Sequence, residues 1–449
     1  MFSRVLVANR SEIAVRVIHA LHEVGAEAVA VYSTADSGTL HTRLADRAVC
    51  IGPPPAGQSY LNIPSVVAAA ETTGCEAVHP GYGFLAENPD FVHACEDNDL
   101  VFIGPDADVM SRMADKVEAK RELAAAGVPL VRGTQALGLD DARSAASDIG
   151  YPVLLKASAG GGGKGMRLVE SPDELEESFP SAGAAALAAF GDGSLYLEKL
   201  ITHARHVEVQ VLCDADGGVL TLGERECSIQ RRHQKLIEES PSPALDESTR
   251  EAMEADVARA CRAISYLNAG TLEFLLAPDG SYHFIELNAR LQVEHPVSEL
   301  VTGIDIVREQ LRIAAGEQLR LTSRASRRGH AVAVRLTAED PSRGFVPAPG
   351  VIERLRWPLG PGIRLDTHVE EGSVIPPYYD SLIGKLIVWD EDRPSAIARC
   401  LRALDELHLR GVPTTQDLAK EILHSEVFRS GRYSTKFLDE TELATVGAA

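Results

Sequence analysis

The chain has 449 residues, of which 45% are hydrophobic and 24% are charged, which is enough for about two to four domains with substantial cores. Its formal net charge of −21 excludes binding to nucleic acid or to an anionic membrane through overall electrostatics. The sequence contains no run of about 18 uncharged apolar residues that would predict a membrane span. The first residues also lack the pattern of a signal peptide. We therefore expect a cytoplasmic protein with no nucleic-acid or membrane partner.

The N-terminal segment predicts an α/β unit. Residues 5–9 and 28–32 are typical of buried strands, and 12–24 of the amphipathic helix between them, which indicates a parallel sheet. The turn at 8–11 carries no GxGxxG, so a dinucleotide site is not predicted there. We interpret this unit as structural, with loops above its strands still able to contribute to a site.

A polar helix at 114–126 predicts the boundary with the next domain. A second α/β segment follows, with strands at 151–158 and 166–170. Beyond it, the pattern predicts a linker, a strand-rich segment and a helical segment at 322–329, 330–389 and 394–425.

The glycine-rich loop Ala159–Gly165 is the most conspicuous local signal. Its four consecutive glycines let backbone N–H groups close over an anion. It is not a GxxxxGK[ST] phosphate loop, because Lys164 is followed by glycine and the loop leads into a strand rather than a helix. We predict a hinged flap over a nucleotide, with a flexible surface turn as the alternative. Lys156, on the strand before the loop, is the expected partner of an α- or β-phosphate.

A hairpin at 271–288 predicts a metal site. Asp279-Gly280 is typical of a two-residue turn, and that turn places Glu273 directly opposite Glu286. Carboxylates so placed repel each other unless a cation lies between them. Asn288 follows on the same face, and three oxygen ligands favour a hard divalent cation. We therefore predict Mg²⁺ (or Mn²⁺) here, with a solvated carboxylate pair on an edge strand as the alternative.

The same register pairs Phe274 with Ile285 on the opposite, core face. If the chain stays extended, the two-residue period also carries Arg290, Gln292 and Glu294 onto the metal face. A guanidinium fork, an amide and a carboxylate that can accept a proton suit a small oxyanion. These residues therefore predict a pocket for a second substrate.

Longer motifs lie along the chain in a fixed order: HPGYGF (79–84), KASAGGGGKGM (156–166), ARHVEVQV (204–211), QRRHQK (230–235), EFLLAPDGSYHFIELNARLQVEHPV (273–297), AEDP (338–341) and PPYYDSLIGKLI (376–387). Together they resemble the biotin carboxylase family, and the resemblance covers essentially the whole chain. Departures include Ala159, where that family commonly has glycine, and Lys164, where arginine is frequent.

This resemblance implies a multidomain α/β and α+β chain with an ATP-grasp fold. An N-terminal Rossmann-like domain would span 1–113. The ATP-grasp domain would span 114–328, with a mobile lid at about 131–201, and the C-terminal biotin carboxylase domain 329–449.

The resemblance also implies site residues. For ATP they are Lys116, Lys156, Gly162, Gly163, Glu198, Lys199, Ile201, His206, Gln230, His233, Glu273 and Glu286. For bicarbonate they are Lys235, Arg290, Gln292, Val293 and Arg335, for biotin Tyr82 and Arg335, and for the metal Glu273, Glu286 and Asn288. The implied catalytic residues are Glu294 as the base, with Arg290, Lys235 and Arg335.

The implied activity is ATP- and Mg²⁺-dependent carboxylation of biotin by bicarbonate through carboxyphosphate, the first half-reaction of acetyl-CoA carboxylase in fatty acid biosynthesis or of another acyl-CoA carboxylase. No methionine in the sequence is followed by lysine, so the Met-Lys-Met biotinylation signal is absent. We therefore expect a separate biotin carboxyl carrier protein and a separate carboxyltransferase, and the resemblance implies a homodimer. Two alternatives are another ATP-grasp ligase that forms an acyl phosphate, and a non-catalytic nucleotide-binding regulator.

Overall fold

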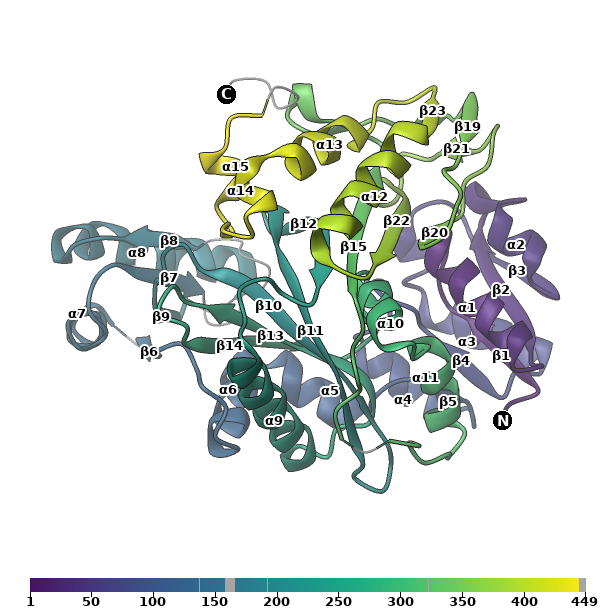
Figure 1. Ribbon diagram of the computed structural model, residues 1–449. Helices are drawn as coiled ribbons and strands as arrows, with labels where there is room; N and C mark the ends of the chain where they lie inside the picture. The colour runs from purple at the N-terminus through teal and green to yellow at the C-terminus, as the bar shows by residue number, and fades with distance from the viewer. Residues whose placement is uncertain (137, 158–165, 192, 322, 444–449) are drawn as a thin grey trace.

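The computed structural model describes residues 1–136, 138–157, 166–191, 193–321 and 323–443, with only the backbone described at 116, 189 and 190 (Figure 1). Three sheets of more than two strands organise these residues. No helix in the described ranges is both long and apolar enough to cross a bilayer.

The N-terminal unit is a five-stranded parallel sheet with strand order β3-β2-β1-β4-β5. The predicted Rossmann-like βαβ unit is thereby confirmed. α1 follows β1 and buries Ile13, Val17 and Leu21 at a helical spacing against the sheet. The elements are β1 (Arg4–Val7), α1 (Ser11–Glu23), β2 (Glu27–Ser33), α2 (Leu40–Leu44), β3 (Arg47–Gly52), α3 (Ile63–Thr73), β4 (Ala77–His79), α4 (Pro89–Glu96), β5 (Val101–Phe102) and α5 (Ala107–Ala114).

The strand order of this sheet reverses between β1 and β4, and ligands of open α/β sheets bind at the carboxyl ends of strands beside such a point. The loops that leave these two strands are tied together by Asn9. Its amide nitrogen donates to the carbonyl oxygens of Pro80 (2.7 Å) and Tyr82 (2.8 Å). A strand that carries no nucleotide motif therefore still helps to position a site.

The predicted helix at 114–126 is confirmed as α6, which begins two residues later and ends one residue earlier than predicted. α5 ends at Ala114, and α6 (Lys116–Ala125) begins after Asp115. The Asp115 carboxylate accepts hydrogen bonds from the backbone nitrogens of Val117 (2.9 Å) and Glu118 (3.0 Å). This N-cap starts a new helix within the polar run.

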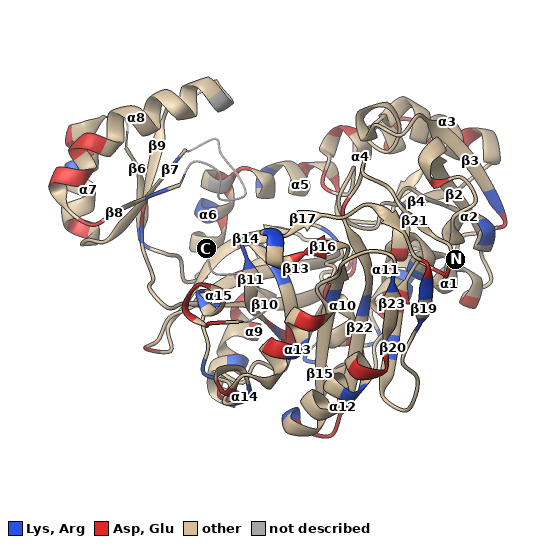
Figure 2. Cartoon of the chain, turned by 90° about the horizontal axis from the view of Figure 1, so that it is seen from above, with Lys and Arg blue, Asp and Glu red and all other residues tan. Residues whose placement is uncertain are grey.

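A four-stranded antiparallel sheet with order β6-β9-β7-β8 forms a second unit, which projects to one side of the molecule in both views (Figures 1 and 2). Its own core contains Val153, Leu155 and Leu197. The predicted loop with Gly162 and Gly163 lies outside the described residues. The elements are β6 (Gly133–Ala136), α7 (Leu139–Ile149), β7 (Val153–Ala157), β8 (Arg167–Val169), α8 (Pro172–Phe190) and β9 (Leu195–Lys199).

The largest sheet has eight strands in the order β14-β13-β10-β11-β12-β15-β22-β20, all antiparallel to their neighbours. β12 and β15 join in register, with Ile237 opposite Val334, so strands before and after residue 329 belong to one sheet. The strands are β10 (Arg205–Cys213), β11 (Val219–Arg231), β12 (Gln234–Ser240), β13 (Asn268–Leu276), β14 (Tyr282–Asn288), β15 (His330–Thr337), β20 (Ile363–Thr367) and β22 (Leu382–Asp390).

Helices and short ribbons cover this sheet (Figure 1). α9 packs on β10 and β11, α10 on β15, and α12 on β15 and β22. The helices are α9 (Glu247–Ala263), α10 (His295–Thr302), α11 (Ile306–Ala314), α12 (Arg393–Glu406), α13 (Gln416–His424), α14 (Glu426–Arg429) and α15 (Phe437–Glu440). The ribbons pair β16 (Glu339–Asp340) with β17 (Val346–Pro347), β18 (Gly350–Val351) with β21 (Val374–Ile375), and β19 (Arg354–Arg356) with β23 (His408–Arg410).

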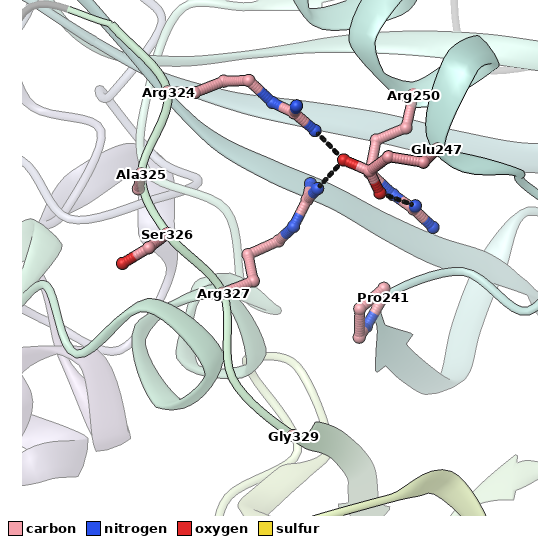
Figure 3. A pocket seen from close by; sticks show the side chains of 8 residues that line it. All are labelled: Pro241, Glu247, Arg250, Arg324, Ala325, Ser326, Arg327 and Gly329. Atoms are coloured by element: carbon pink, nitrogen blue, oxygen red, sulfur yellow. Dashed lines mark hydrogen bonds and ion pairs between the residues drawn. The ribbon is translucent and has the colours of Figure 1, made fainter.

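The segment predicted as a linker, at 322–329, is held onto α9 by ion pairs in its described part, 323–329. Arg324 and Arg327 both reach the carboxylate of Glu247, at 2.6 and 3.2 Å (Figure 3). They line a cavity of about 510 Å³ in which Arg250 also pairs with Glu247, at 2.6 Å. Because each guanidinium there already has a carboxylate partner, this pocket offers no unpaired positive charge to an anion.

Candidate active site

One cavity of about 1160 Å³ lies where the three sheets meet, slightly above the usual size range of ligand sites. The turn after β1, the loop after β4 and the segment between β14 and α10 line it, as does the segment before and within α15. Nearly all the residues predicted from the sequence line this same cavity: Tyr82, Lys156, Glu198, Lys199, Ile201, His206, Gln230, His233, Lys235, Glu273, Glu286, Asn288, Arg290, Gln292, Val293, Glu294 and Arg335.

The other three predicted residues have no described side-chain position. Gly162 and Gly163 lie outside the described residues, and at Lys116 only the backbone is described, as the first residue of α6.

A row of charged residues crosses four neighbouring strands under the cavity. Glu208 on β10 pairs in register with Arg225 on β11 and with Glu273 on β13. Glu273 in turn pairs with Glu286 on β14, as the sequence predicted. The next row contains Gln210, Thr271 and Asn288.

The turn of this hairpin differs from the prediction. The Ala277 nitrogen donates to the Ser281 oxygen (2.7 Å), so the loop has three residues instead of two. Gly280 adopts φ 87° at the left-handed position, and the Asp279 carboxylate accepts from the Ser281 nitrogen (2.9 Å). A three-residue loop with glycine at this position is the common longer alternative to the two-residue turn.

A β-bulge then compensates for the longer loop. Phe274 pairs with Phe284, so the predicted pair Phe274–Ile285 is wrong. The extra residue restores the register at the next position, where Glu273 still faces Glu286. Ile285, displaced from the predicted core face, lines the cavity.

The carboxylates of the hairpin fit a hard divalent cation. Glu273, Glu286 and Asn288 line one cavity and supply carboxylate and amide oxygens, the ligand types that Mg²⁺ prefers. The Asn288 amide nitrogen donates to Glu273 Oε1 (3.0 Å), which places these two side chains in contact. Burial opposes ionisation of Glu273, yet the attraction of Lys235 and His206 prevails and lowers its pKa, so it is a carboxylate at neutral pH.

Lys235 lines the cavity and contacts three carboxylates. Its Nζ is 2.6 Å from Glu208 Oε2, 3.1 Å from Glu273 Oε1 and 2.5 Å from Glu294 Oε1. β11 and β12 place it through a tight hairpin in which Gln230 pairs with Lys235. The two residues at the tip, Arg232 and His233, have φ of 47° and 67°, a left-handed backbone that costs non-glycine residues about 1 kcal/mol or more each. Local strain is thus accepted where the cavity needs both side chains.

Glu294 joins Lys235 to Arg335. Its second oxygen accepts from Arg335 Nη2 (3.0 Å), and Arg335 Nε donates to Glu238 Oε1 (2.5 Å). Although burial opposes ionisation, Lys235 and Arg335 hold the pKa of Glu294 well below its usual value. The Cys227 sulfur lies 4.0 Å from Glu294, and burial raises the pKa of this thiol, so it is no thiolate nucleophile.

The residues between β14 and α10 extend this polar wall without forming a strand. Arg290 donates to Glu87 (2.8 Å), Gln292 (2.9 Å) and Asn288 (3.1 Å). The Gln292 amide nitrogen donates to Glu273 (3.0 Å). The extended chain assumed from the sequence is not formed here, yet Arg290, Gln292 and Glu294 all line the cavity.

The opposite end of the cavity belongs to the four-stranded sheet. Lys156 on β7 and Lys120 on α6 each place Nζ 2.7 Å from one oxygen of Glu198 on β9. The ammonium of Lys199 donates to the carbonyl oxygens of Gly150 (2.8 Å) and Tyr151 (3.0 Å). Of the two predicted lysines, Lys156 therefore has fewer protein partners than Lys199, and its side chain remains 27% exposed.

Sequence reasoning missed several charged residues at the site: Glu12, Glu87, Lys120, Glu208, Arg225, Glu238 and Lys385. A signal existed for Glu208, because His206, Glu208 and Gln210 alternate with valines on a strand whose residues are all buried. Polar residues in a buried strand need partners, and their two-residue period places them on one face.

Comparisons with known proteins agree with this architecture. The family described as biotin carboxylase, N-terminal domain, matches residues 1–110, and the biotin carboxylase C-terminal domain matches 333–440. The ATP-binding domain of the carbamoyl-phosphate synthase L chain matches 115–322.

Similar proteins cover nearly the whole chain. A biotin carboxylase of Nostoc sp. is 52% identical over 98% of this chain and 99% of its own length. A pyruvate carboxylase subunit of Methanothermobacter thermautotrophicus is 50% identical over 98% of this chain and 90% of its own length. The biotin carboxylase domain dimer of Hydrogenobacter thermophilus 2-oxoglutarate carboxylase, solved with MgADP, ADP and bicarbonate, has a TM-score of 0.92 and 47% identity, with 98% of both chains covered.

Proposed function

The chain belongs to the biotin carboxylase family, and we propose that it carboxylates biotin with bicarbonate in a reaction driven by ATP and Mg²⁺. One observation carries this proposal. A single cavity holds a carboxylate that two cations contact, Glu294 between Lys235 and Arg335, beside a row of metal-type oxygen ligands.

The nucleotide is assigned to the end of the cavity with Lys156, Glu198, His206 and His233. Lys156 is the cation we expect on a phosphate, since its present partner Glu198 keeps a second lysine. Glu273, Glu286 and Asn288 would hold Mg²⁺, which when bound neutralises charge on the nucleotide phosphates. The backbone and cations of this chain then orient the γ-phosphate toward the second substrate.

Bicarbonate is assigned to Lys235, Arg290, Gln292 and Val293, with Glu294 as its base. A carboxylate with a depressed pKa is a weak base, and Lys235 and Arg335 are the cause of the depression. An anion that binds these cations competes for them, and Glu294 then gains basicity when its substrate is present. Glu294 takes the bicarbonate proton, a bicarbonate oxygen attacks the γ-phosphorus, and ADP leaves to give carboxyphosphate.

Carboxyphosphate then breaks its C–O bond to give carbon dioxide and phosphate. The phosphate takes the proton of the biotin ureido nitrogen, and that nitrogen attacks carbon dioxide to form carboxybiotin. Arg335 stabilises the ureido oxygen of the enolate, and Tyr82 lines the biotin side. Exclusion of water from the reaction end, where Lys235, Glu273 and Glu294 are buried, would protect the labile intermediate.

We propose that the biotin is attached to a separate carrier protein and that a carboxyltransferase completes the reaction in the cytoplasm. The acceptor is open, because similar proteins serve pyruvate carboxylase and 2-oxoglutarate carboxylase besides the expected acetyl-CoA carboxylase. We also propose a homodimer, as in the Hydrogenobacter domain, and domains at 1–113, 114–328 and 329–449.

The test measures ATP hydrolysis and carboxybiotin by the purified chain with free biotin, with and without bicarbonate. We expect ATP cleavage that requires bicarbonate and increases with biotin, with ¹⁴C transferred from bicarbonate to biotin. Amine acceptors serve as the comparison. Turnover that requires an amine would replace this proposal with an acyl-phosphate ligase, and no turnover with any acceptor would leave a nucleotide-binding regulator.

A further inference from the structure

A buried lysine lies beside the reaction end of the cavity. Lys385 on β22 is 1% exposed and is the cross-strand neighbour of both Arg335 on β15 and Asp366 on β20. It therefore projects from the same face of the sheet as Arg335. It is not among the residues that line the cavity, so its contacts are with protein.

The ammonium of Lys385 connects two walls of the site. Nζ donates to the carbonyl oxygen of Val293 (3.0 Å) and lies 3.1 Å from Glu12 Oε1 and 3.7 Å from Asp366 Oδ2. Val293 directly precedes Glu294, so this bond holds the peptide that carries the expected base.

Glu12 continues the connection to the opposite wall. It belongs to the first turn of α1 and is 1% exposed. The same oxygen that faces Lys385 accepts the hydroxyl hydrogen of Tyr82, whose ring also lies 5.8 Å from Lys385 Nζ. Glu12 Oε2 has no hydrogen-bond partner in the described part of the chain, so Glu12 depends on Lys385 and Tyr82.

The segment around Val293 is held at three successive residues. His295 Nδ1 lies 2.7 Å from the Gln292 carbonyl oxygen, Lys385 binds the Val293 carbonyl, and Lys235 and Arg335 bind the Glu294 side chain. Of these contacts, only the one from Lys385 continues to Tyr82. The chain thus has one path from the expected bicarbonate wall to the expected biotin wall within these contacts.

Stability does not account for this arrangement. A fully buried ion pair costs desolvation of both charges, and apolar residues of similar volume usually stabilise a fold as well or better. Burial raises the pKa of Glu12 to about 7 against the attraction of Lys385, so its charge is present only at a cost.

We propose that Lys385 and Glu12 are positioning residues that hold the Val293–Glu294 peptide and the Tyr82 side chain at a fixed separation, so that carbon dioxide formed at one wall reaches biotin at the other. This inference rests on the proposed function and adds two residues that touch no substrate. It predicts that loss of the Lys385–Glu12 pair uncouples ATP cleavage from carboxylation: ATP is still cleaved, but less carboxybiotin forms.

The variants are Lys385→Met, the double variant Glu12→Gln/Lys385→Met, and Tyr82→Phe, each in the full-length chain. Lys385→Met alone leaves Glu12 as an uncompensated buried charge, and the double variant removes both charges at similar volume. Tyr82→Phe removes only the hydroxyl that Glu12 accepts. Lys420→Met is the control, because that lysine on α13 pairs with Asp405 at 3.3 Å outside the cavity.

Two quantities are measured at pH 8, where Glu12 is ionised: ATP cleaved in the presence of bicarbonate, and carboxybiotin formed per ATP. In the double variant we expect carboxybiotin per ATP to fall by about 10- to 100-fold, as for a small misplacement of reacting groups, and the KM for ATP to stay within about twofold. Tyr82→Phe should lower the same ratio by a smaller factor, and Lys420→Met should leave it unchanged.

Unchanged carboxybiotin per ATP in the folded double variant and in Tyr82→Phe would overturn the inference. If the double variant does not fold, the Tyr82→Phe ratio decides the outcome alone. Failure of the proposed function is a separate result, since the wild-type chain would then form no carboxybiotin at all.

Discussion

The two ends of the cavity differ in how far they depend on the small four-stranded sheet, although His206 of the eight-stranded sheet also belongs to the nucleotide end. At the reaction end, Lys235, Glu273 and Glu294 all come from the eight-stranded sheet or the segment that leaves it, and their side chains are at most 10% exposed. At the nucleotide end, Lys156 comes from the small four-stranded sheet and is 27% exposed. The reaction end is preorganised by buried ion pairs, whereas the nucleotide end depends on a unit with its own core.

The comparison predicts its largest effect at Glu294. We expect Glu294→Gln to lower carboxybiotin formation by about 10²- to 10⁴-fold, the usual contribution of a positioned general base. Nucleotide binding should stay within about threefold, because Glu294 lies at the other end of the cavity. Rates are measured with ¹⁴C-bicarbonate, and ADP affinity by calorimetry.

The matched control for that variant is Arg324→Gln, which removes a charge from the second, fully paired pocket. Its rate should equal that of the wild type. A Glu294→Gln enzyme that retains a tenth of the wild-type rate would remove Glu294 from the role of base.

A smaller and different effect is expected at the nucleotide end. Lys156→Met should raise the KM for ATP by about 10- to 100-fold, the value of one charge-assisted hydrogen bond. The KM for bicarbonate should change little. Within the described residues, the side chains of Lys235, Arg290 and Gln292 make their hydrogen bonds outside the four-stranded sheet that carries Lys156. The measurement is steady-state kinetics with ATP and bicarbonate varied in turn. A rise in both KM values would contradict the separate roles of the two ends of the cavity.

The last effect concerns acid, and it falls on stability instead of on the reaction rate. Burial lowers the pKa of His41 to about 4, so the folded state resists protonation that the unfolded chain accepts at about 6.5. The unfolded state then binds more protons, and stability decreases as the pH falls from about 6.5 to 4, by up to about 3 kcal/mol for this one residue. Residues 131–201 contain no histidine, so this loss belongs to the rest of the molecule.

The measurement is the free energy of unfolding in urea at several pH values between 4 and 7.5. We expect His41→Gln to give a curve that falls less steeply with acid than that of the wild type. Parallel curves for the two proteins would show that His41 does not carry the effect.

The hairpin at Asp279 shows both the strength and the limit of sequence reasoning. The predicted pairing of Glu273 with Glu286 is right, yet the turn was predicted one residue too short. The register survived because a bulge at Ile285 offsets the longer loop. Turn signals identify a hairpin but do not fix its loop length, and a bulge leaves no clear mark in the sequence.

The eight-stranded sheet was harder to foresee. Its pairing of β12 with β15 joins strands on either side of the predicted boundary, and the polar composition of 322–329 gave no sign of the ion pairs that hold it to α9. Nothing in the sequence indicated that Glu12 and Lys385 meet, although Lys385 lies within the motif at 376–387. They are 373 residues apart in the numbering, and each has ordinary neighbours in its own element.

Glu208 lies between these cases. The alternation of polar residues with valines in β10 was visible, but it could be interpreted only once the strand was known to be buried on both faces. Period-two patterns are usually taken to separate a wet face from a dry one. In β10 the polar face is also buried and lies beside the cavity, so the same pattern indicates a functional site.

The β12–β15 pairing has a consequence for how the protein can be divided. A fragment that ends near residue 329 would leave β12 with an unpaired edge, and the remaining C-terminal piece would present the bare edge of β15. Such edges recruit other chains into extended β-structure. The C-terminal quarter is therefore not an interchangeable module, and recombination between relatives should preserve both strands from the same parent.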